Sequence, residues 1–326
     1  MHLKLLRIAA SAALCGGVVT LGFVSTQSAM AVPATVINVP CDTGTLITDM
    51  TSPVNNTVLN LAANCTYSLT GSTGLPTVTN EVTINGHNSW IQRSYGNTNS
   101  FSIFVVDSTV ETTGDLILKS VNVANGGGSG TYDGGAIDID SAYECPSVSV
   151  SGGTFRDNST EEYGGAISNK CTLTVTNATF TNNSSTEGGA ISSYGTALSA
   201  SLVHDTFSHN SASDEGGAIY NNDNDMTVTD SYFKYNSADD GGAIYNYYGL
   251  TIKHSQITYN SASSYGGGVY NDNDATINDS LIMFNTAGSG AGGIINEDET
   301  YLSNDLINLN RPDQCEPLNT IAGCVG

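Results

Sequence analysis

Basic residues are scarce in this sequence, which has nine Lys and Arg against 31 Asp and Glu and a formal net charge of −22. Nucleic acids and anionic membranes are bound by dense positive charge, so we exclude both as expected partners. A negative surface suits calcium and other cations better. The bases are also scattered along the chain, so the sequence offers no basic catalytic set.

Sequence motifs of common enzymes and metal sites are absent as well. There is no nucleophile elbow, P-loop, HExxH motif, EF-hand loop or Cys-x-x-Cys pair. We therefore expect that the protein requires no cofactor. Calcium is the one candidate cation.

Long apolar runs are lacking beyond one stretch, Ile8 to Val24, which contains glycine and is short for a membrane span. Lys4 and Arg7 precede it, and Ala29-Met30-Ala31 follows it as a small-residue cleavage site. We predict that residues 1–31 are a secretory signal, that the protein is extracellular, and that the mature chain has no transmembrane span. Retention of the stretch as an anchor is the alternative.

Cysteine is rare, and six of the seven cysteines lie beyond the predicted signal. An even number in an exported chain favours disulfides, although six cysteines allow many pairings. We predict pairing between nearest neighbours: Cys41–Cys65, Cys145–Cys171 and Cys315–Cys324.

The dominant feature of the sequence is one pattern that recurs seven times. A Gly-Gly-Ala-Ile box, altered in the last copies, begins at Gly134, Gly164, Gly188, Gly216, Gly241, Gly266 and Ala291. A second box, Phe-x-x-Asn or Ile-x-x-Asn, begins at Phe155, Phe180, Phe207, Phe233, Ile257, Ile282 and Ile307. The period is 24 to 30 residues, which indicates a solenoid.

The residues between the boxes predict strands. Runs such as Leu173-Thr174-Val175-Thr176 alternate with a period of two, and no copy has room for a helix of useful length. Three apolar columns recur in each copy, which predicts three short strands per coil. Stacked in register, such coils form a parallel β-helix with one coil every ~4.8 Å.

Two further columns fit sharp turns. We predict an asparagine ladder, because Asn tolerates left-handed backbone and stacked amides hydrogen-bond along the solenoid. The ladder comprises Asn158, Asn183, Asn210, Asn236, Asn260, Asn285 and Asn310. The paired glycines should stand at a corner where a Cβ would clash.

The repeats divide the chain. Residues 32–125 are expected to form an N-terminal cap, with a short helix near Leu46, and two or three degenerate coils. Residues 126–310 form the repeat region, and residues 311–326 a disulfide-closed C-terminal cap. Arg311-Pro312 is expected to end strand pairing. A solenoid needs caps because its end coils would otherwise expose core and strand edges.

The two boxes resemble the repeat of the chlamydial polymorphic outer-membrane proteins, from Gly134 to Asn310. The resemblance implies a right-handed β-helix that works in adhesion at the bacterial surface. Those proteins end in a membrane β-barrel, whereas this chain ends soon after its last box, so we expect no barrel anchoring. We therefore predict an all-β fold, a right-handed parallel β-helix of the pectin lyase-like type, with about ten coils and a cap at both ends.

Acidic residues precede several glycine pairs, and the coil register should stack them. Stacked carboxylates repel one another unless they stay solvated, shift their pKa values or recruit a cation. We therefore predict a calcium site, with a solvated acidic face as the alternative. The candidate ligands are Glu187, Asp214, Glu215, Asp239 and Asp240.

Two other columns are candidates for function. The row Tyr220, Tyr245 and Tyr270 would bind glycans if it is exposed, and otherwise simply covers the β-surface. A turn column that includes His204 and Asp230 could hold a metal, but turn positions also favour Asn and Asp for structural reasons.

These observations favour binding over catalysis. We predict a monomeric secreted or cell-surface-associated protein that binds cell-surface or matrix glycans, or proteins, with adhesion as the role that the resemblance implies. The alternative is a polysaccharide lyase or hydrolase that acts on acidic glycans through the acidic face. Such enzymes need Arg or Lys bases, or Gly-His-Gly and Arg-Ile-Lys motifs, and the sequence lacks these sets.

Overall fold

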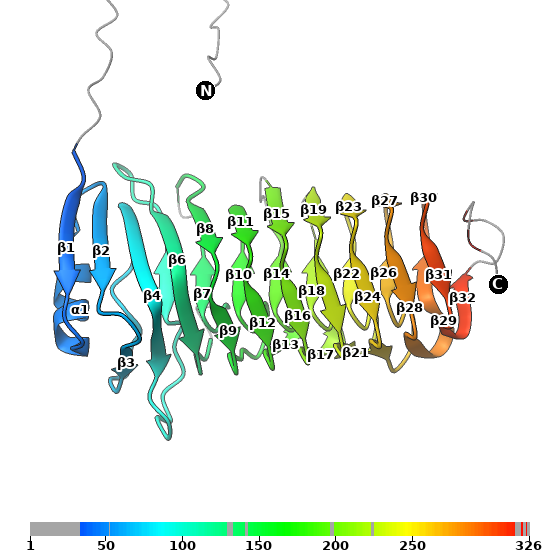
Figure 1. Ribbon diagram of the computed structural model, residues 1–326, viewed down its shortest axis with the longest axis horizontal. Helices are drawn as coiled ribbons and strands as arrows, with labels where there is room; N and C mark the ends of the chain where they lie inside the picture. Colours follow the sequence, from blue (N-terminus) through cyan, green and yellow to red (C-terminus); the bar gives the residue numbers. More distant parts are fainter. Residues whose placement is uncertain are drawn as a thin grey trace, which may run out of the picture. The chain divides into compact units, whose positions relative to one another are not determined.

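The computed structural model describes residues 33–326, apart from residues 52, 129–132, 141–142, 196–198, 223–224, 317–320, 322–323 and 325–326. The predicted signal, residues 1–31, lies outside the described residues. The described chain forms a parallel β-solenoid of about 11 turns, with the coils stacked side by side along one axis (Figure 1). The predicted all-β parallel solenoid is confirmed, and its right-handed winding stays a prediction.

The larger sheet contains two columns of strands, and every strand pairs in parallel with its neighbours in the adjacent coils. The first column holds β1 (Thr35–Val39), β2 (Thr57–Leu61), β4 (Glu81–Arg93), β6 (Asp115–Ala124), β8 (Ser147–Ser151), β11 (Thr172–Thr176), β15 (Ser199–Val203), β19 (Met226–Thr229), β23 (Leu250–Lys253), β27 (Ala275–Asn278) and β30 (Thr300–Ser303). The second column holds β3 (Thr66–Leu69), β9 (Thr154–Arg156), β12 (Thr179–Thr181), β16 (Thr206–Ser208), β20 (Tyr232–Lys234), β24 (Gln256–Thr258), β28 (Leu281–Met283) and β31 (Leu306–Asn308), and the ends of β4 and β6 extend it.

The smaller sheet contains the remaining strands. The third column holds β13 (Ser184–Glu187), β17 (Ser211–Glu215), β21 (Ser237–Ala238) and β25 (Ser261–Ala262). The fourth column holds β5 (Phe104–Val106), β7 (Ile137–Ile139), β10 (Ile167–Asn169), β14 (Ile191–Ser193), β18 (Ile219–Asn221), β22 (Ile244–Asn246), β26 (Val269–Asn271) and β29 (Thr286–Asn296), which also closes the third column, and β32 (Arg311–Glu316) pairs with β29. The prediction of three strands per coil is wrong for the middle coils, which have four, because the segment after the ladder asparagine also pairs in parallel.

The phenylalanines of the second box stack inside the solenoid, as predicted. Phe155, Phe180, Phe207 and Phe233 are fully buried, and successive ring centroids lie 5.0, 4.9 and 4.7 Å apart. Each buried ring contributes roughly 1.5–3 kcal/mol through the apolar surface that it removes from water. The core therefore runs along the solenoid axis, and its register is fixed by the repeat.

The asparagine ladder is present, but its turn works differently from the prediction. Each ladder residue, such as Asn183, is buried and donates its backbone N–H and its Nδ2 to the Oδ1 of the next, here Asn210, at 3.0 and 2.9 Å. The left-handed backbone lies one residue earlier, at Asn182 with φ 55°. The ladder side chain must point inward to bond along the axis, so the preceding residue makes the turn.

The paired glycines form the predicted corner. Gly164 has φ +65°, a conformation that side chains rarely adopt. A Cβ on Gly165 would lie 2.2 Å from the carbonyl oxygen of Gly189 in the next coil. Both positions therefore require glycine, and the same geometry recurs in the following coils.

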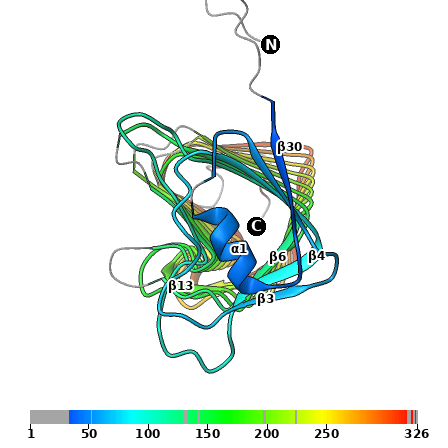
Figure 2. The same cartoon turned by 90° about the vertical axis from the view of Figure 1, so that its left-hand side faces the viewer.

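The N-terminal end carries the expected short helix, α1 (Thr43–Met50). Asp42 caps it by accepting a hydrogen bond from the Thr45 N–H at 2.7 Å. Leu46 and Met50 are buried in the core cluster, and α1 crosses the open end of the first coils (Figure 2). The helix thus covers apolar surface that the first coil would otherwise expose.

Three disulfides, Cys41–Cys65, Cys145–Cys171 and Cys315–Cys324, join the pairs predicted from the sequence, with Cα separations of 5.6, 5.1 and 6.3 Å. At the C-terminal end the expectation that Arg311-Pro312 ends strand pairing is wrong, because β32 begins at Arg311 and pairs with β29. Pro312 is exposed there, where an absent N–H costs little. Among the described residues, no helix has both the length and the apolarity that a membrane span requires.

Candidate functional site

One face of the solenoid carries most of the candidate residues, and we call it the glycine-box face. It consists of the middle residues of the fourth-column strands, which stack in register and alternate with inward-pointing Ile and Asn side chains. These residues are Val105, Asp138, Ser168, Ser192, Tyr220, Tyr245, Tyr270 and Ile295. All except Tyr270 are buried.

The tyrosine row of this face stacks as the repeat predicts but is not exposed. Ring centroids lie 5.8 Å apart for Tyr220 and Tyr245, and 4.7 Å apart for Tyr245 and Tyr270. Only 6% of Tyr220 and 7% of Tyr245 is accessible. The Tyr270 hydroxyl donates to Glu297 at 3.2 Å. This row therefore covers the β-surface, which was the alternative reading, and leaves little ring area for a ligand.

The acidic residues before the glycine pairs form a row beside the tyrosines, one coil apart. Glu187 pairs in register with Glu215, and Glu215 forms a β-bridge with Asp240. Burial and, to a smaller extent, the negative charges of Glu187, Asp214 and Asp240 together raise the pKa of Glu215 to about 7. Burial also raises the pKa of Glu187 and of Asp240. The predicted stacking of these backbones is confirmed.

Asp239 has hydrogen-bond partners that differ from those of the adjacent Asp240. Its Oδ1 accepts hydrogen bonds from the hydroxyls of Ser263 and Ser264, which lowers its pKa. The backbone N–H of Asp239 donates to the carbonyl of Asp214 at 2.9 Å. In the part of the chain that the structure describes, no three His, Cys, Asp or Glu side chains converge closely enough to hold a metal ion. Calcium binding stays a prediction.

A buried acid–base cluster at the N-terminal end of this face was not singled out from the sequence. Asp138 has no accessible surface, and burial raises its pKa to about 7, with Lys170 opposing the shift. Lys170 Nζ lies 3.4 Å from Asp133 Oδ2 and 3.5 Å from Asp140 Oδ1. The Tyr194 hydroxyl donates to Asp133.

The Asp138 carboxyl is poorly satisfied. Neither of its oxygens makes a hydrogen bond of ordinary geometry to any described residue, although Ser168 stands beside it in the next coil. The sequence holds one signal of this cluster. Asp follows the Gly-Gly-Ala-Ile box only in the first copy, where later copies have Ser, Tyr or, in the last, Ile.

The turn column of His and Asp is exposed. His204 Nε2 lies 3.7 Å from Asp230 Oδ2, and His254 lies 3.9 Å from Asp230 and 3.7 Å from Asp279. These residues have left-handed backbone, as Asp and Asn turns do. Exposed pairs of this kind contribute little to stability. The geometry agrees with a turn column in which His is tolerated.

A second row of aromatic side chains lies on another face, and sequence reasoning missed it. We call it the aromatic ridge: the rings of His209, Tyr235, Tyr259 and Phe284, continued by the aliphatic Leu309, each immediately before a ladder asparagine. Successive ring centroids lie 5.1, 5.6 and 4.9 Å apart along the ridge. The accessible fraction is 46% for Tyr235, 45% for Tyr259, 39% for Phe284 and 51% for Leu309. Lys234 Nζ lies 4.7 Å from the centre of the Tyr235 ring.

Comparison with known proteins identifies the repeat. The family model described as Chlamydia polymorphic membrane protein (Chlamydia_PMP) repeat matches residues 177–194, 206–222 and 230–247. The chain carries this repeat. Each matched segment spans one Phe-x-x-Asn box and the following glycine box, which the structure places in one coil. No curated protein and no solved structure matches the chain.

Proposed function

We propose that this protein is a secreted or cell-surface-associated β-helix that binds glycans or proteins along its elongated side and acts in adhesion. The repeat supports a surface-type β-helix protein, because the matching family is one of membrane proteins. The observation that carries the proposal is the aromatic ridge, which presents large side chains to solvent on successive coils.

The ridge residues have left-handed backbone, in which bulky aromatic side chains are energetically unfavourable. Tyr235, Tyr259 and Phe284 have φ of 59°, 57° and 58°, where bulky residues are outliers that cost roughly 1–3 kcal/mol each. The same column holds Asp157 and Asn182 in earlier coils, which adopt this conformation more easily. Strained, exposed aromatics in a row indicate a contact surface.

Binding of the purified mature protein to cells and to matrix-coated surfaces tests this proposal. The double variant Tyr235→Asn, Tyr259→Asn places residues that accept left-handed backbone at both turns, so it should fold with a melting temperature no lower than that of the wild type. We expect it to lose about tenfold or more in apparent affinity. Tyr248→Asn is the control, since Tyr248 is 47% accessible and lies off the ridge. Equal binding by the wild type and the double variant would contradict the proposal.

One observation favours a second function, a polysaccharide lyase or hydrolase. The partly accessible Glu215 has a pKa near 7 and is protonated often enough at neutral pH to serve as a general acid, and Glu187 and Asp240 supply carboxylates in the adjacent coils. Acidic polysaccharides would then release reducing or unsaturated ends. Glu215→Gln should abolish the release, whereas Asp205→Asn, at a fully buried carboxyl in the other sheet, should not.

A further inference from the structure

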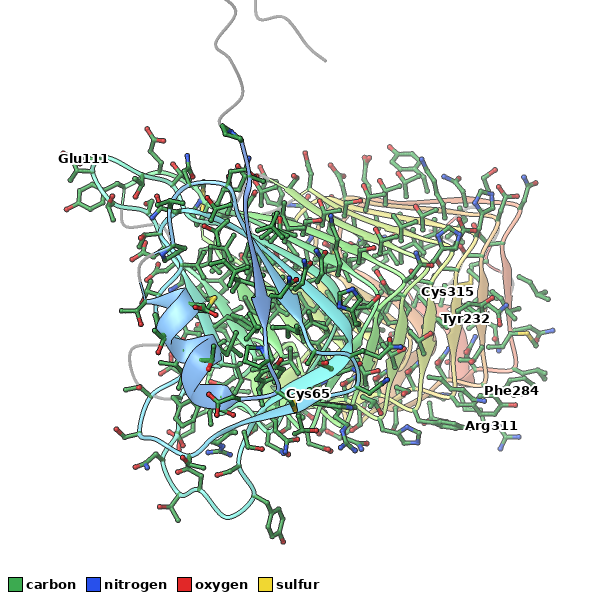
Figure 3. The ribbon with its side chains drawn as sticks, turned by 60° about the vertical axis from the view of Figure 1, so that its left-hand side comes forward. Cys65, Glu111, Tyr232, Phe284, Arg311 and Cys315 are labelled. Atoms are coloured by element: carbon green, nitrogen blue, oxygen red, sulfur yellow. A yellow bond between two sulfur atoms is a disulfide. The ribbon has the colours of Figure 1, made fainter. Side chains whose placement is uncertain are left out.

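The C-terminal end of the aromatic ridge opens into a hollow of 570 Å³, which we call the C-terminal hollow. Its lining includes Tyr259, Phe284 and Leu309 from the ridge, together with Asn308, Arg311 and Gln314. This volume is in the range of small-ligand sites, roughly 300–1,000 Å³. Phe284 and Arg311 both project from the same side of the C-terminal coils (Figure 3).

The charge of this region differs from that of the whole protein. The formal net charge is −22, yet the residues that line the hollow include Arg311 and no Asp or Glu. The Arg311 guanidinium is exposed and has no ion pair or hydrogen bond with any described side chain. Lys234 adds a second positive charge along the ridge. A free guanidinium in an acid-free hollow is a site for an anion.

Some polar groups of the hollow hydrogen-bond within the protein, and others have a donor available for a ligand. Gln314 Oε1 accepts from the backbone N–H and Nδ2 of Asn310, at 3.0 and 3.1 Å, and so ends the asparagine ladder. Asn308 Oδ1 accepts from the Leu309 N–H at 2.8 Å. The Nδ2 of Asn308 has no partner among the described residues and can donate to a ligand hydroxyl.

The regular spacing of the ridge side chains also suits a ligand with a repeating structure. Its side chains recur once per coil, with ring separations close to 5 Å, and Tyr259 covers one face of Phe284 at an interplanar angle of 11°. A linear polymer with regularly spaced rings can contact such a row along its length. Amide donors, tyrosine hydroxyls and a guanidinium suit sugar hydroxyls and carboxylate or sulfate groups.

We propose that the aromatic ridge and the C-terminal hollow bind an acidic glycan chain. The sugar rings lie along Tyr235, Tyr259 and Phe284, while Arg311 and Lys234 pair with carboxylate or sulfate groups. The inference rests on the proposed binding function and names its ligand class and site. It assigns glycan binding to the aromatic ridge instead of the row of Tyr220, Tyr245 and Tyr270, in which Tyr220 and Tyr245 are buried.

Titration calorimetry with the intact folded protein tests the inference. The probes are oligogalacturonate as a carboxylated chain, heparin oligosaccharide as a sulfated chain, and cello-oligosaccharide as an uncharged chain. We expect binding of at least one anionic chain, little binding of the uncharged chain, and weaker affinity at higher salt. Arg311→Gln should weaken binding about tenfold or more, and Phe284→Asn should do so without unfolding the turn.

Arg156→Gln is the matched control, because Arg156 does not line the hollow and its guanidinium is engaged by other groups: it lies over the Trp90 ring and 3.8 Å from Asp157. Equal binding of charged and uncharged chains, or unchanged affinity in Arg311→Gln, would overturn the acidic specificity. If the protein binds cells or matrix proteins through the ridge but no glycan, this inference fails while the proposed function stands. Failure of all surface binding would instead defeat the proposed function itself.

Discussion

Asn236 and Asn260 are joined by two hydrogen bonds across adjacent coils. The backbone N–H and the Nδ2 of Asn236 both donate to Oδ1 of Asn260, at 3.0 and 2.9 Å. The Nδ2 of Asn236 also donates to the carbonyl of Phe207 at 3.1 Å. The ladder thus satisfies buried polar groups in each coil and fixes the distance between coils.

Replacing one ladder residue should therefore destabilise the solenoid. Asn236→Asp removes both Nδ2 donors and places a carboxylate oxygen against two acceptors, at a cost of about 3 kcal/mol or more. Urea unfolding at pH 7 measures this loss. Asn304→Asp is the control, because Asn304 is an exposed turn residue in a column that also contains Asp230 and Asp279. A small effect at position 236 would mean that the ladder is not a stabilising network.

The Cys145–Cys171 disulfide should stabilise more than the Cys315–Cys324 disulfide. The first closes a sequence separation of 26 residues between two coils, and the second only nine residues at the chain's end. Loop-closure entropy predicts about 3 kcal/mol for the longer loop and less for the shorter one. Double Cys→Ala variants of each pair, compared by thermal unfolding, should show the larger decrease in melting temperature for Cys145 and Cys171. The reverse order would contradict this reasoning.

Buried Asp205 should make stability depend on pH. Burial raises its pKa from 3.8 to about 7, while its Oδ1 accepts from the Ala178 N–H at 2.7 Å and its Oδ2 has no partner among the described residues. The folded state therefore binds this proton more tightly than the unfolded state. The stabilisation is complete below the unfolded pKa and is lost as pH rises through about 7.

Asp205→Asn keeps an oxygen acceptor but does not ionise. We expect the stability of the variant relative to the wild type to increase by about 1–3 kcal/mol between pH 5 and pH 8, because the wild type loses the protonated Asp205 over this range. Denaturant unfolding at the two pH values measures the difference. Exposed Asp313→Asn serves as the control and should change neither value. A relative stability that does not increase between the two pH values would contradict the assigned cost of the charge.

Calcium should raise the melting temperature of the wild-type protein. Glu187, Glu215 and Asp240 stand one coil apart, and a cation that binds only the folded state stabilises it by mass action. The rise should be larger at pH 8 than at pH 6, because the Glu215 carboxyl ionises around 7. Scanning calorimetry with millimolar calcium measures it.

The control for this prediction lies in the same chain. Glu215→Gln combined with Asp240→Asn should remove most of the calcium-dependent rise, whereas Asp313→Asn in β32 should leave it intact. A wild-type melting curve that does not move with calcium would show that the acidic row is a solvated charge row.

The sequence by itself determined the solenoid, three of its four strand columns, the stacking of Phe155 to Phe233 and the three disulfide pairs. A repeat that places the same residue type once per coil determines how successive coils align. An apolar column can be buried only if its equivalent residues lie above one another. The N-terminal helix at Leu46 also followed from local pattern. These features depend on residues that are equivalent from coil to coil.

Only the tertiary structure decided which columns of side chains are accessible to solvent. It also decided which residues that differ from the repeat consensus come together. The rows through Tyr245 and through Tyr259 have the same one-coil period, so the spacing in the sequence does not distinguish them. In the structure Tyr245 is buried, whereas Tyr259 lies on an exposed turn with left-handed backbone. Only the structure shows that Lys170 pairs with Asp133 and Asp140 and that its charge acts on the buried Asp138. Burial depends on side chains contributed by several coils at once, and a pattern along one chain does not contain that information.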